Sequence, residues 1–75
     1  MYLAFDLYDI QHLHNLNAAL HAWSDRFDIP YNTKTVRNIK RVTFDQDNSY
    51  TLFAVSWDHE RLPFSLIDQH KIDNP

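Results

Sequence analysis

The clearest hydrophobic pattern in the chain is a helical one that runs from residue 10 to residue 27. Asp9 is predicted to cap this helix, because its carboxylate can accept free backbone N–H groups of the first turn. Pro30 is expected to close the segment, since the residue before a proline is pushed out of the helical region. The apolar residues recur every three or four positions and so share one helix face: Leu13, Leu16, Leu20, Trp23 and Phe27.

Residues 2–8 are predicted to form a strand that precedes this helix. Apolar and other residues alternate here, and aromatic residues are frequent, as strands favour. A helical alternative exists, because Leu3, Leu7 and Ile10 also fit a helical stripe. Residues 28–33 are expected to connect the helix to the next strand.

The segment from residue 33 to residue 41 has two interpretations. Its β-branched residues favour an extended segment that becomes a regular strand at Ile39 and continues to Phe44. The alternative is a short helix capped by Asn32 or Thr33. The extended interpretation is the preferred one.

The C-terminal half is predicted to contain a β-hairpin. The polar residues 45–49 are a turn of suitable length. Residues 50–57 are predicted to be the following strand, in which Phe53, Val55 and Trp57 alternate with other residues. Residues 58–61 are read as a charged turn and 62–67 as a fourth strand, which Pro63 places at a sheet edge or at the start of the strand. Residues 68–75 are predicted to be a polar tail.

These elements predict one small α+β domain over residues 1–75 in the order β-α-β-β-β. One long helix would pack on a mainly antiparallel sheet of three or four strands. Because a single helix covers only one face of a sheet, the opposite face is expected to be exposed. Tyr2, Tyr8, Tyr50 and Leu52 are predicted to lie on it.

Composition excludes several classes of site and of protein. The chain has 75 residues, 44% of them hydrophobic, which is enough for a packed core. There is no glycine, which excludes Gly-rich phosphate loops, and no cysteine, which excludes disulfides and thiolate metal sites. No apolar run is long enough to cross a membrane, and no secretory signal is evident. We expect a cytoplasmic protein.

A basic stretch stands out in a chain whose formal net charge is −3. It contains Lys34, Arg37, Lys40 and Arg41, and no acidic residue lies between Ile29 and Phe44. Such a stretch could contact phosphates or an acidic protein surface. The alternative is a solvated strand edge whose charges prevent aggregation. Few aromatic residues interleave with it, so base stacking is poorly supported.

No catalytic, cofactor or metal site is predicted. His21 and Asp25 are four residues apart on the helix and could pair, but the histidines lack the spacing of a zinc site. The serines lack the glycine-flanked turn of a hydrolase nucleophile. A domain this small with a filled core also has little room for a substrate pocket. We therefore expect no enzymatic activity and no cofactor.

The first ten residues resemble the first strand of the small ferredoxin-like CRISPR-associated and VapD nucleases. In those proteins the strand ends in an aspartate, and Asp9 is the matching residue here. The resemblance implies a ferredoxin-like fold and a metal- or carboxylate-dependent nuclease. It spans only this one segment, and the predicted element order has no second helix between the third and fourth strands. The chain is therefore not assigned to that family.

The sequence predicts a non-enzymatic module that binds another protein and regulates or inhibits a larger macromolecular machine. Phage-encoded inhibitors of host defence are one class of such small acidic proteins. Homodimerisation through the exposed face or through an edge strand is a competing use, and a nucleic-acid-binding module that uses residues 34–41 is the alternative function. The predicted partner-binding residues are the exposed Tyr2, Tyr8, Tyr50 and Leu52, the basic Lys34, Arg37, Lys40 and Arg41, and the acidic Asp45, Asp47, Asp58 and Glu60.

Overall fold

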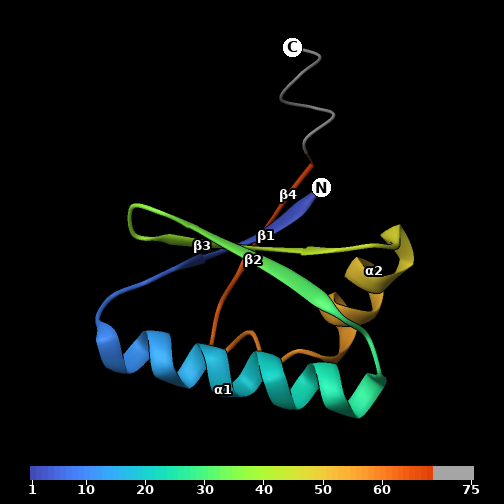
Figure 1. The fold of residues 1–75 in the computed structure, drawn as a ribbon, viewed down its shortest axis with the longest axis horizontal. Helices are drawn as coiled ribbons and strands as arrows, with labels where there is room; N and C mark the ends of the chain where they lie inside the picture. Colours follow the sequence, from blue (N-terminus) through green and yellow to red (C-terminus); the bar gives the residue numbers. More distant parts are fainter. Residues whose placement is uncertain (69–75) are drawn as a thin grey trace.

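The computed structural model describes residues 1–68, which form two helices and a four-stranded antiparallel sheet (Figure 1). The chain is thus a small α+β fold, as predicted. Of the predicted polar tail, residues 69–75 lie outside the described residues. The elements in chain order are β1 (Tyr2–Asp6), α1 (Ile10–Phe27), β2 (Tyr31–Val36), β3 (Ile39–Phe44), α2 (Asp47–Ser56) and β4 (Ser65–Ile67).

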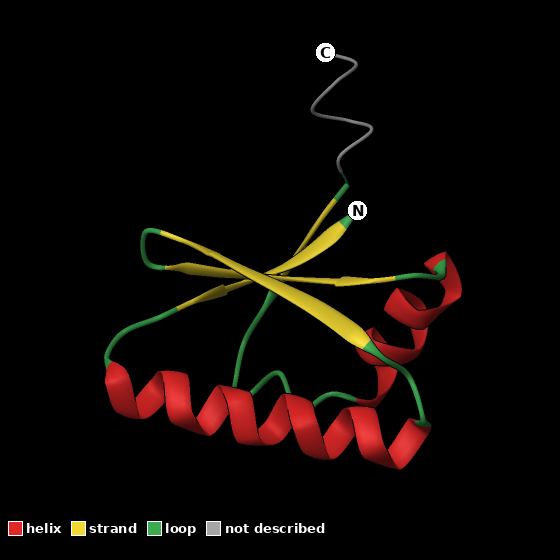
Figure 2. Ribbon diagram, in the orientation of Figure 1, coloured by secondary structure: helices red, strands yellow, loops and turns green. Residues whose placement is uncertain are grey.

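The four strands lie in the order β2-β3-β1-β4, and all neighbours are antiparallel. Because β1 and β2 are both antiparallel to β3, they run parallel to each other with β3 inserted between them. This β-α-β-β-α-β arrangement is the split β-α-β, or ferredoxin-like, topology. Helix α1 runs below the sheet, and α2 lies at one end on the same side (Figure 2). Neither helix of the described chain covers the opposite face of the sheet.

Helix α1 has the predicted bounds and the predicted cap. The Asp9 Oδ1 atom accepts the His12 N–H at 2.7 Å. At the other end, Asp28 adopts the left-handed conformation with φ 55°, which closes the helix without a glycine. The apolar stripe of α1 points to the sheet and buries Leu16, Leu20 and Trp23.

The prediction that residues 50–57 form a strand is wrong, because residues 50–56 belong to α2 and Trp57 is its C-cap. The same apolar residues also fit a helical stripe: Tyr50, Phe53 and Trp57 are spaced by three and four, and all three are buried. Val55, which a strand would place beside Phe53, is 78% exposed. The inference that the chain has no second helix between the third and fourth strands is therefore also wrong.

The hairpin lies earlier in the chain than predicted. Strands β2 and β3 pair along their whole length, from Tyr31 with Phe44 to Val36 with Ile39. Residues 33–41 therefore contain two strands and a tight turn rather than one extended segment. Residues 45–49, which were predicted to be the turn of a hairpin, lead into the first turn of α2.

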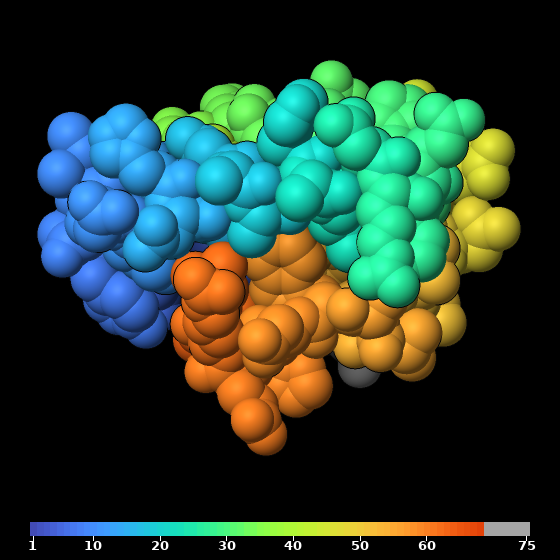
Figure 3. Space-filling model, turned by 90° about the horizontal axis from the view of Figure 1, so that it is seen from below, coloured from blue at the N-terminus to red at the C-terminus, as the bar shows by residue number. Residues whose placement is uncertain are grey.

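The predicted fourth strand is shorter than expected but lies at the predicted place. Only Ser65–Ile67 is regular, and it pairs with β1 at one edge of the sheet. The segment that leads to it lies beside α1 on the helical side of the molecule, where it is orange in Figure 3. Leu62 of this segment is buried, and its carbonyl accepts the Trp57 Nε1–H at 2.8 Å.

The core is an aromatic cluster between the two helices and one face of the sheet. Phe53 of α2 is fully buried at its centre. Its ring centroid lies 4.5 to 6.2 Å from those of five other aromatic residues, a range typical of favourable ring contacts: Phe5, Trp23, Phe44, Trp57 and Phe64.

Buried polar groups tie α2 to the rest of the core. The Tyr50 hydroxyl donates to the Met1 carbonyl and accepts the Phe44 N–H, both at 2.9 Å. It thereby joins the start of β1 to the end of β3. The Trp23 Nε1–H of α1 donates to Ser56 Oγ of α2 at 2.8 Å. Because each polar tip has a partner, these amphipathic aromatic side chains can be buried at little cost.

Replacing Asp9 should separate its capping role from its charge. Asp9→Ala is expected to lower the free energy of unfolding by about 1 kcal/mol, because it leaves first-turn N–H groups without an acceptor. Asp9→Asn should retain most of the stability. Urea denaturation followed by circular dichroism measures both, and equal losses in the two variants would contradict capping.

The β2–β3 turn contains a second test of stability. Arg37 has φ 56°, a conformation that disfavours residues with a Cβ atom. Arg37→Gly is therefore expected to raise the free energy of unfolding by about 1 kcal/mol, whereas Arg37→Ala, which keeps the Cβ atom, should not. Thermal denaturation compares the three proteins, and no gain for the glycine variant would show that the turn is not strained.

Candidate functional site

The candidate site lies on the face of the sheet that the helices leave uncovered, which we call the open face. The strand register determines which residues lie on this face, because residues paired across neighbouring strands point to the same side. Lys34 pairs with Arg41, and Arg41 with Ala4. The open face comprises Tyr2, Ala4 and Asp6 of β1, Asn32, Lys34 and Val36 of β2, Ile39, Arg41 and Thr43 of β3, and Ser65 and Ile67 of β4.

A shallow hollow of about 310 Å³ lies in this face near the β2 edge. It brings together two cationic side chains, an amide, hydroxyl groups and one aromatic ring. Thr33 also lines it, although its side chain points to the other side of β2. The lining residues of the hollow are Tyr2, Asn32, Thr33, Lys34, Arg41 and Thr43.

Arg41 and Lys34 make the hollow electropositive. The Arg41 guanidinium lies 4.9 Å from the centroid of the Tyr2 ring, within the range of a cation–π contact. This contact holds the guanidinium over the face of the sheet. Neither cation forms an ion pair with another of the residues 1–68. Both charges thus remain available to an anionic group of a partner.

The other two residues of the basic stretch lie elsewhere. Arg37 is exposed at the tip of the β2–β3 turn. Lys40 points to the helical side of the sheet, where it pairs with Phe5 of β1 and is only 7% exposed. Burial lowers the pKa of its ammonium group below the ordinary value. The prediction that the four basic residues form one surface patch is therefore wrong for Lys40.

The aromatic and apolar residues predicted for the exposed face are mostly placed differently. Only Tyr2 lies on it. Tyr50 and Leu52 belong to α2: Tyr50 is buried, and Leu52 packs against the core. Tyr8 is exposed but lies beyond the end of β1, where its ring contacts His12 at 4.7 Å. The prediction was wrong for Tyr50 and Leu52 because it assigned a helix as a strand.

The predicted acidic rims do not border the open face. Asp45 lines a separate hollow of about 170 Å³, together with Asp28 and Ser49, where α1 ends and α2 begins. Asp47 is in the first turn of α2. Asp58 and Glu60 are exposed in the loop after α2, on the helical side. The charged strand residues of the open face are consequently Asp6, Lys34 and Arg41.

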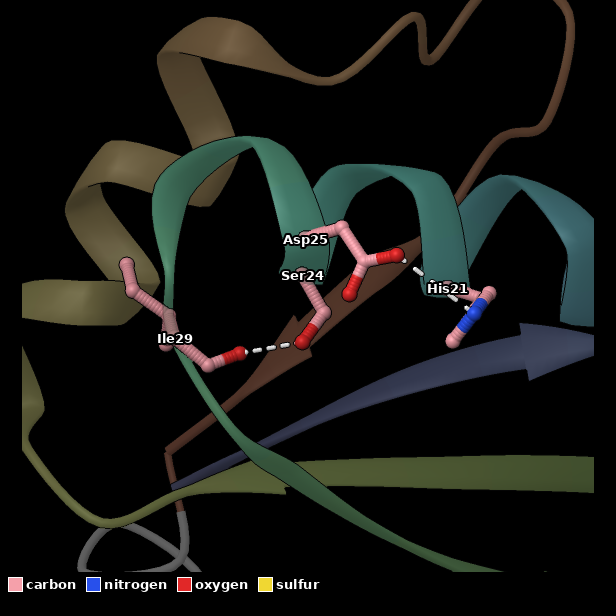
Figure 4. A network of polar contacts seen from close by, with 4 residues as sticks. All are labelled: His21, Ser24, Asp25 and Ile29. Atoms are coloured by element: carbon pink, nitrogen blue, oxygen red, sulfur yellow. Dashed lines mark hydrogen bonds and ion pairs between the residues drawn. The ribbon is translucent and has the colours of Figure 1, made fainter.

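The His21–Asp25 pair that helical spacing allowed is present. Their nearest nitrogen and oxygen atoms are 3.5 Å apart on the exposed side of α1 (Figure 4). Beside them, the Ser24 hydroxyl donates to the Ile29 carbonyl at 2.6 Å and secures the end of the helix. Both side chains of the pair are about three-quarters exposed. An ion pair this exposed contributes little to stability.

Within residues 1–68, no group of three or more His, Asp or Glu side chains is placed to hold a metal ion. Asp9, the residue that the nuclease resemblance singled out, is occupied as the cap of α1. The chemistry gathered on the open face is that of binding: positive charge, amide and hydroxyl groups, and one ring.

Sequence reasoning missed three residues of the hollow, Asn32, Thr33 and Thr43. Asn32 was assigned to a connection, although it begins the alternation that continues through Lys34 to Val36. That alternation was the available signal. The contact between Tyr2 and Arg41 depends on the pairing of β1 with β3, which a single sequence does not reveal.

Comparison with protein-family models, with curated proteins and with solved structures finds no match to this chain. Function must therefore be argued from the open face itself. No helix within the described part of the chain is both long and apolar enough to span a membrane.

The burial of Lys40 predicts that replacing this residue changes the free energy of unfolding by an amount that depends on pH. Lys40→Met is expected to raise the free energy of unfolding at pH 7 by about 1 kcal/mol, because it removes a poorly hydrated charge and keeps the packed stem. The advantage should shrink as the pH approaches 10.5, the ordinary lysine value. The lowered pKa means that folded Lys40 releases its proton before the unfolded chain does, so the wild type gains stability in that interval.

Urea denaturation of both proteins at pH 7 and near pH 10.5 measures this change. Lys34→Met is the matched control, because Lys34 is exposed on the open face and should show no such gain. An advantage of Lys40→Met that is constant with pH would contradict the role of desolvation.

Proposed function

We propose that this chain is a non-enzymatic module that binds another protein through the open face. The binding surface is centred on the hollow lined by Tyr2, Lys34 and Arg41. Regulation or inhibition of a larger macromolecular machine remains the expected role of such a module, and a phage-encoded inhibitor of host defence is one form of it.

The observation that supports this proposal is a pair of cations without an ion-pair partner among residues 1–68, on the sheet face that the helices leave uncovered. Lys34 and Arg41 are neighbours across β2 and β3, yet neither forms an ion pair with the residues described. The whole chain is acidic, with a net charge of −3, so a local positive surface is not a consequence of overall composition. Complementary charge on a partner would guide association and fix its orientation.

Binding of nucleic acid is the second candidate, and the contact of Arg41 with Tyr2 favours it. A planar guanidinium next to an aromatic ring can stack with bases and pair with phosphates. However, sheets that read single-stranded RNA present aromatic residues on two strands. Here the outward residues of β3 are Ile39, Arg41 and Thr43, and only β1 contributes a ring. A protein partner is therefore the better fit.

The decisive experiment compares two charge-reversed variants of the full chain. The open-face variant carries Lys34→Glu and Arg41→Glu. The control carries Arg26→Glu on α1 and Arg61→Glu in the loop after α2. Both positions are exposed, and the two substitutions make the same change in net charge. Each tagged protein is cross-linked in cells that naturally express it, purified, and analysed for partners by mass spectrometry.

We expect one protein to be captured by the wild type and by the control but to be at least tenfold depleted with the open-face variant. Circular dichroism must show that all three are folded. Equal capture of that protein by both variants would refute the role of the open face. Loss of capture after nuclease treatment would replace the proposal with nucleic-acid binding.

A further inference from the structure

The edge of the sheet next to the hollow has the properties of a docking strand. β2 has six residues and, among the described elements, has a neighbour only on its β3 side. Its register with β3 is continuous, without a bulge or a proline. The four central residues, 32–35, are all exposed. Outward backbone N–H and C=O groups of such a strand can pair with an added strand.

The two cations of the open face lie close to this edge. Lys34 belongs to the edge strand itself, and Arg41 is its neighbour across β2 and β3. Both side chains line the hollow, so they are within reach of a strand that is added beside β2. On a strand paired with β2, alternate side chains would lie over the open face. Acidic side chains there would meet both cations.

A second copy of this chain fits the edge less well than an acidic strand does. Two β2 strands related by a twofold axis, with their open faces on the same side, would place each Lys34 directly opposite or diagonal to its counterpart. Like charges at such positions destabilise the pairing of strands. The same lysine would attract carboxylates, so charge discriminates between the two occupants.

We propose that the partner contributes an extended acidic segment that pairs with the free edge of β2 and places alternate carboxylates over Lys34 and Arg41. This inference rests on the proposed function and specifies how the open face binds. Main-chain hydrogen bonds would supply affinity, and the two cations would select for acidic residues on one side of the segment.

The test uses synthetic hexapeptides and the full 75-residue chain. The probe is acetylated, amidated Thr-Glu-Thr-Glu-Thr-Glu, in which the three carboxylates share one side when extended. A Thr-Lys peptide of the same length is the charge control. Two further Thr-Glu peptides carry N-methyl groups on either all threonines or all glutamates, which blocks hydrogen bonding along one edge or the other.

Titration followed by nuclear magnetic resonance, together with amide hydrogen exchange, gives the readout. The Thr-Glu peptide is expected to bind and to slow exchange of alternate β2 amides at least tenfold, whereas the Thr-Lys peptide should not bind. One of the two methylated peptides should bind at least tenfold more weakly than the other. The Lys34→Glu, Arg41→Glu variant should lose binding, and Lys40→Met, which changes a buried lysine, should keep it.

Other outcomes overturn the inference in distinguishable ways. Equal binding of all Thr-Glu peptides, abolished by the open-face variant, would leave the open face as the site but refute strand pairing. Binding that survives in the open-face variant would refute both the inference and the proposed surface. Preferential binding of oligothymidine would show that the open face binds nucleic acid and not an acidic protein segment. Protection of β2 in a peptide-free dimer, detected by sedimentation, would assign the edge to a second copy.

Discussion

The packing of one phenylalanine ring determines how this small chain is arranged. Phe53 contacts aromatic rings from β1, β3 and α1, from the loop before β4 and from the C-cap of its own helix. A short helix that buries such a residue must lie on the same side of the sheet as α1. Both helices then share one core, and nothing in the described chain requires the opposite face to be apolar. The open face is thus a consequence of where the aromatic residues are gathered.

Strand alternation then decides which basic residues are available to a partner. Lys40 and Arg41 are adjacent in sequence, but one points toward the core and the other toward solvent. The buried lysine has a lowered pKa, whereas the half-buried arginine is held by Tyr2 from the neighbouring strand. Of the basic stretch in the sequence, Lys34 and Arg41 are therefore the two cations that lie side by side on the open face.

The long helix and the first strand could be predicted because their patterns extend over many residues and agree with a capping residue and a proline. The segment 50–57 could not be assigned reliably, because alternation and helical spacing both fit eight residues that contain so many apolar side chains. Its true state depends on burial of Phe53 and exposure of Val55, which are tertiary properties. The β2–β3 turn was missed because Arg37 stands where glycine or asparagine usually signals a hairpin.

The same error changed the candidate site. Treating α2 as a strand moved Tyr50 and Leu52 onto the exposed face. Asn32 was left out for another reason, because Pro30 and Asn32 together are typical of a connection. Tyr2 was assigned to the first strand and to the exposed face, which is where it lies. One extended segment through residues 33–41 would have put Lys34 and Arg41 on opposite faces, whereas the β2–β3 turn brings them to the same face. A single sequence does not show which strands pair. The contact between Tyr2 and Arg41 follows from the pairing of β1 with β3.

The central position of β1 also has a consequence for how the chain reaches its native state. Ala4 pairs with Arg41 on one side and with Ser65 on the other. The first strand can therefore be fully paired only when β3 and β4, from the middle and the end of the described chain, are present. Contacts so distant in sequence carry a high loop-closure cost and slow folding. During synthesis, the β2–β3 hairpin can form before the sheet closes, while β1 and its apolar residues stay without β4 until almost all of the described chain has emerged from the ribosome.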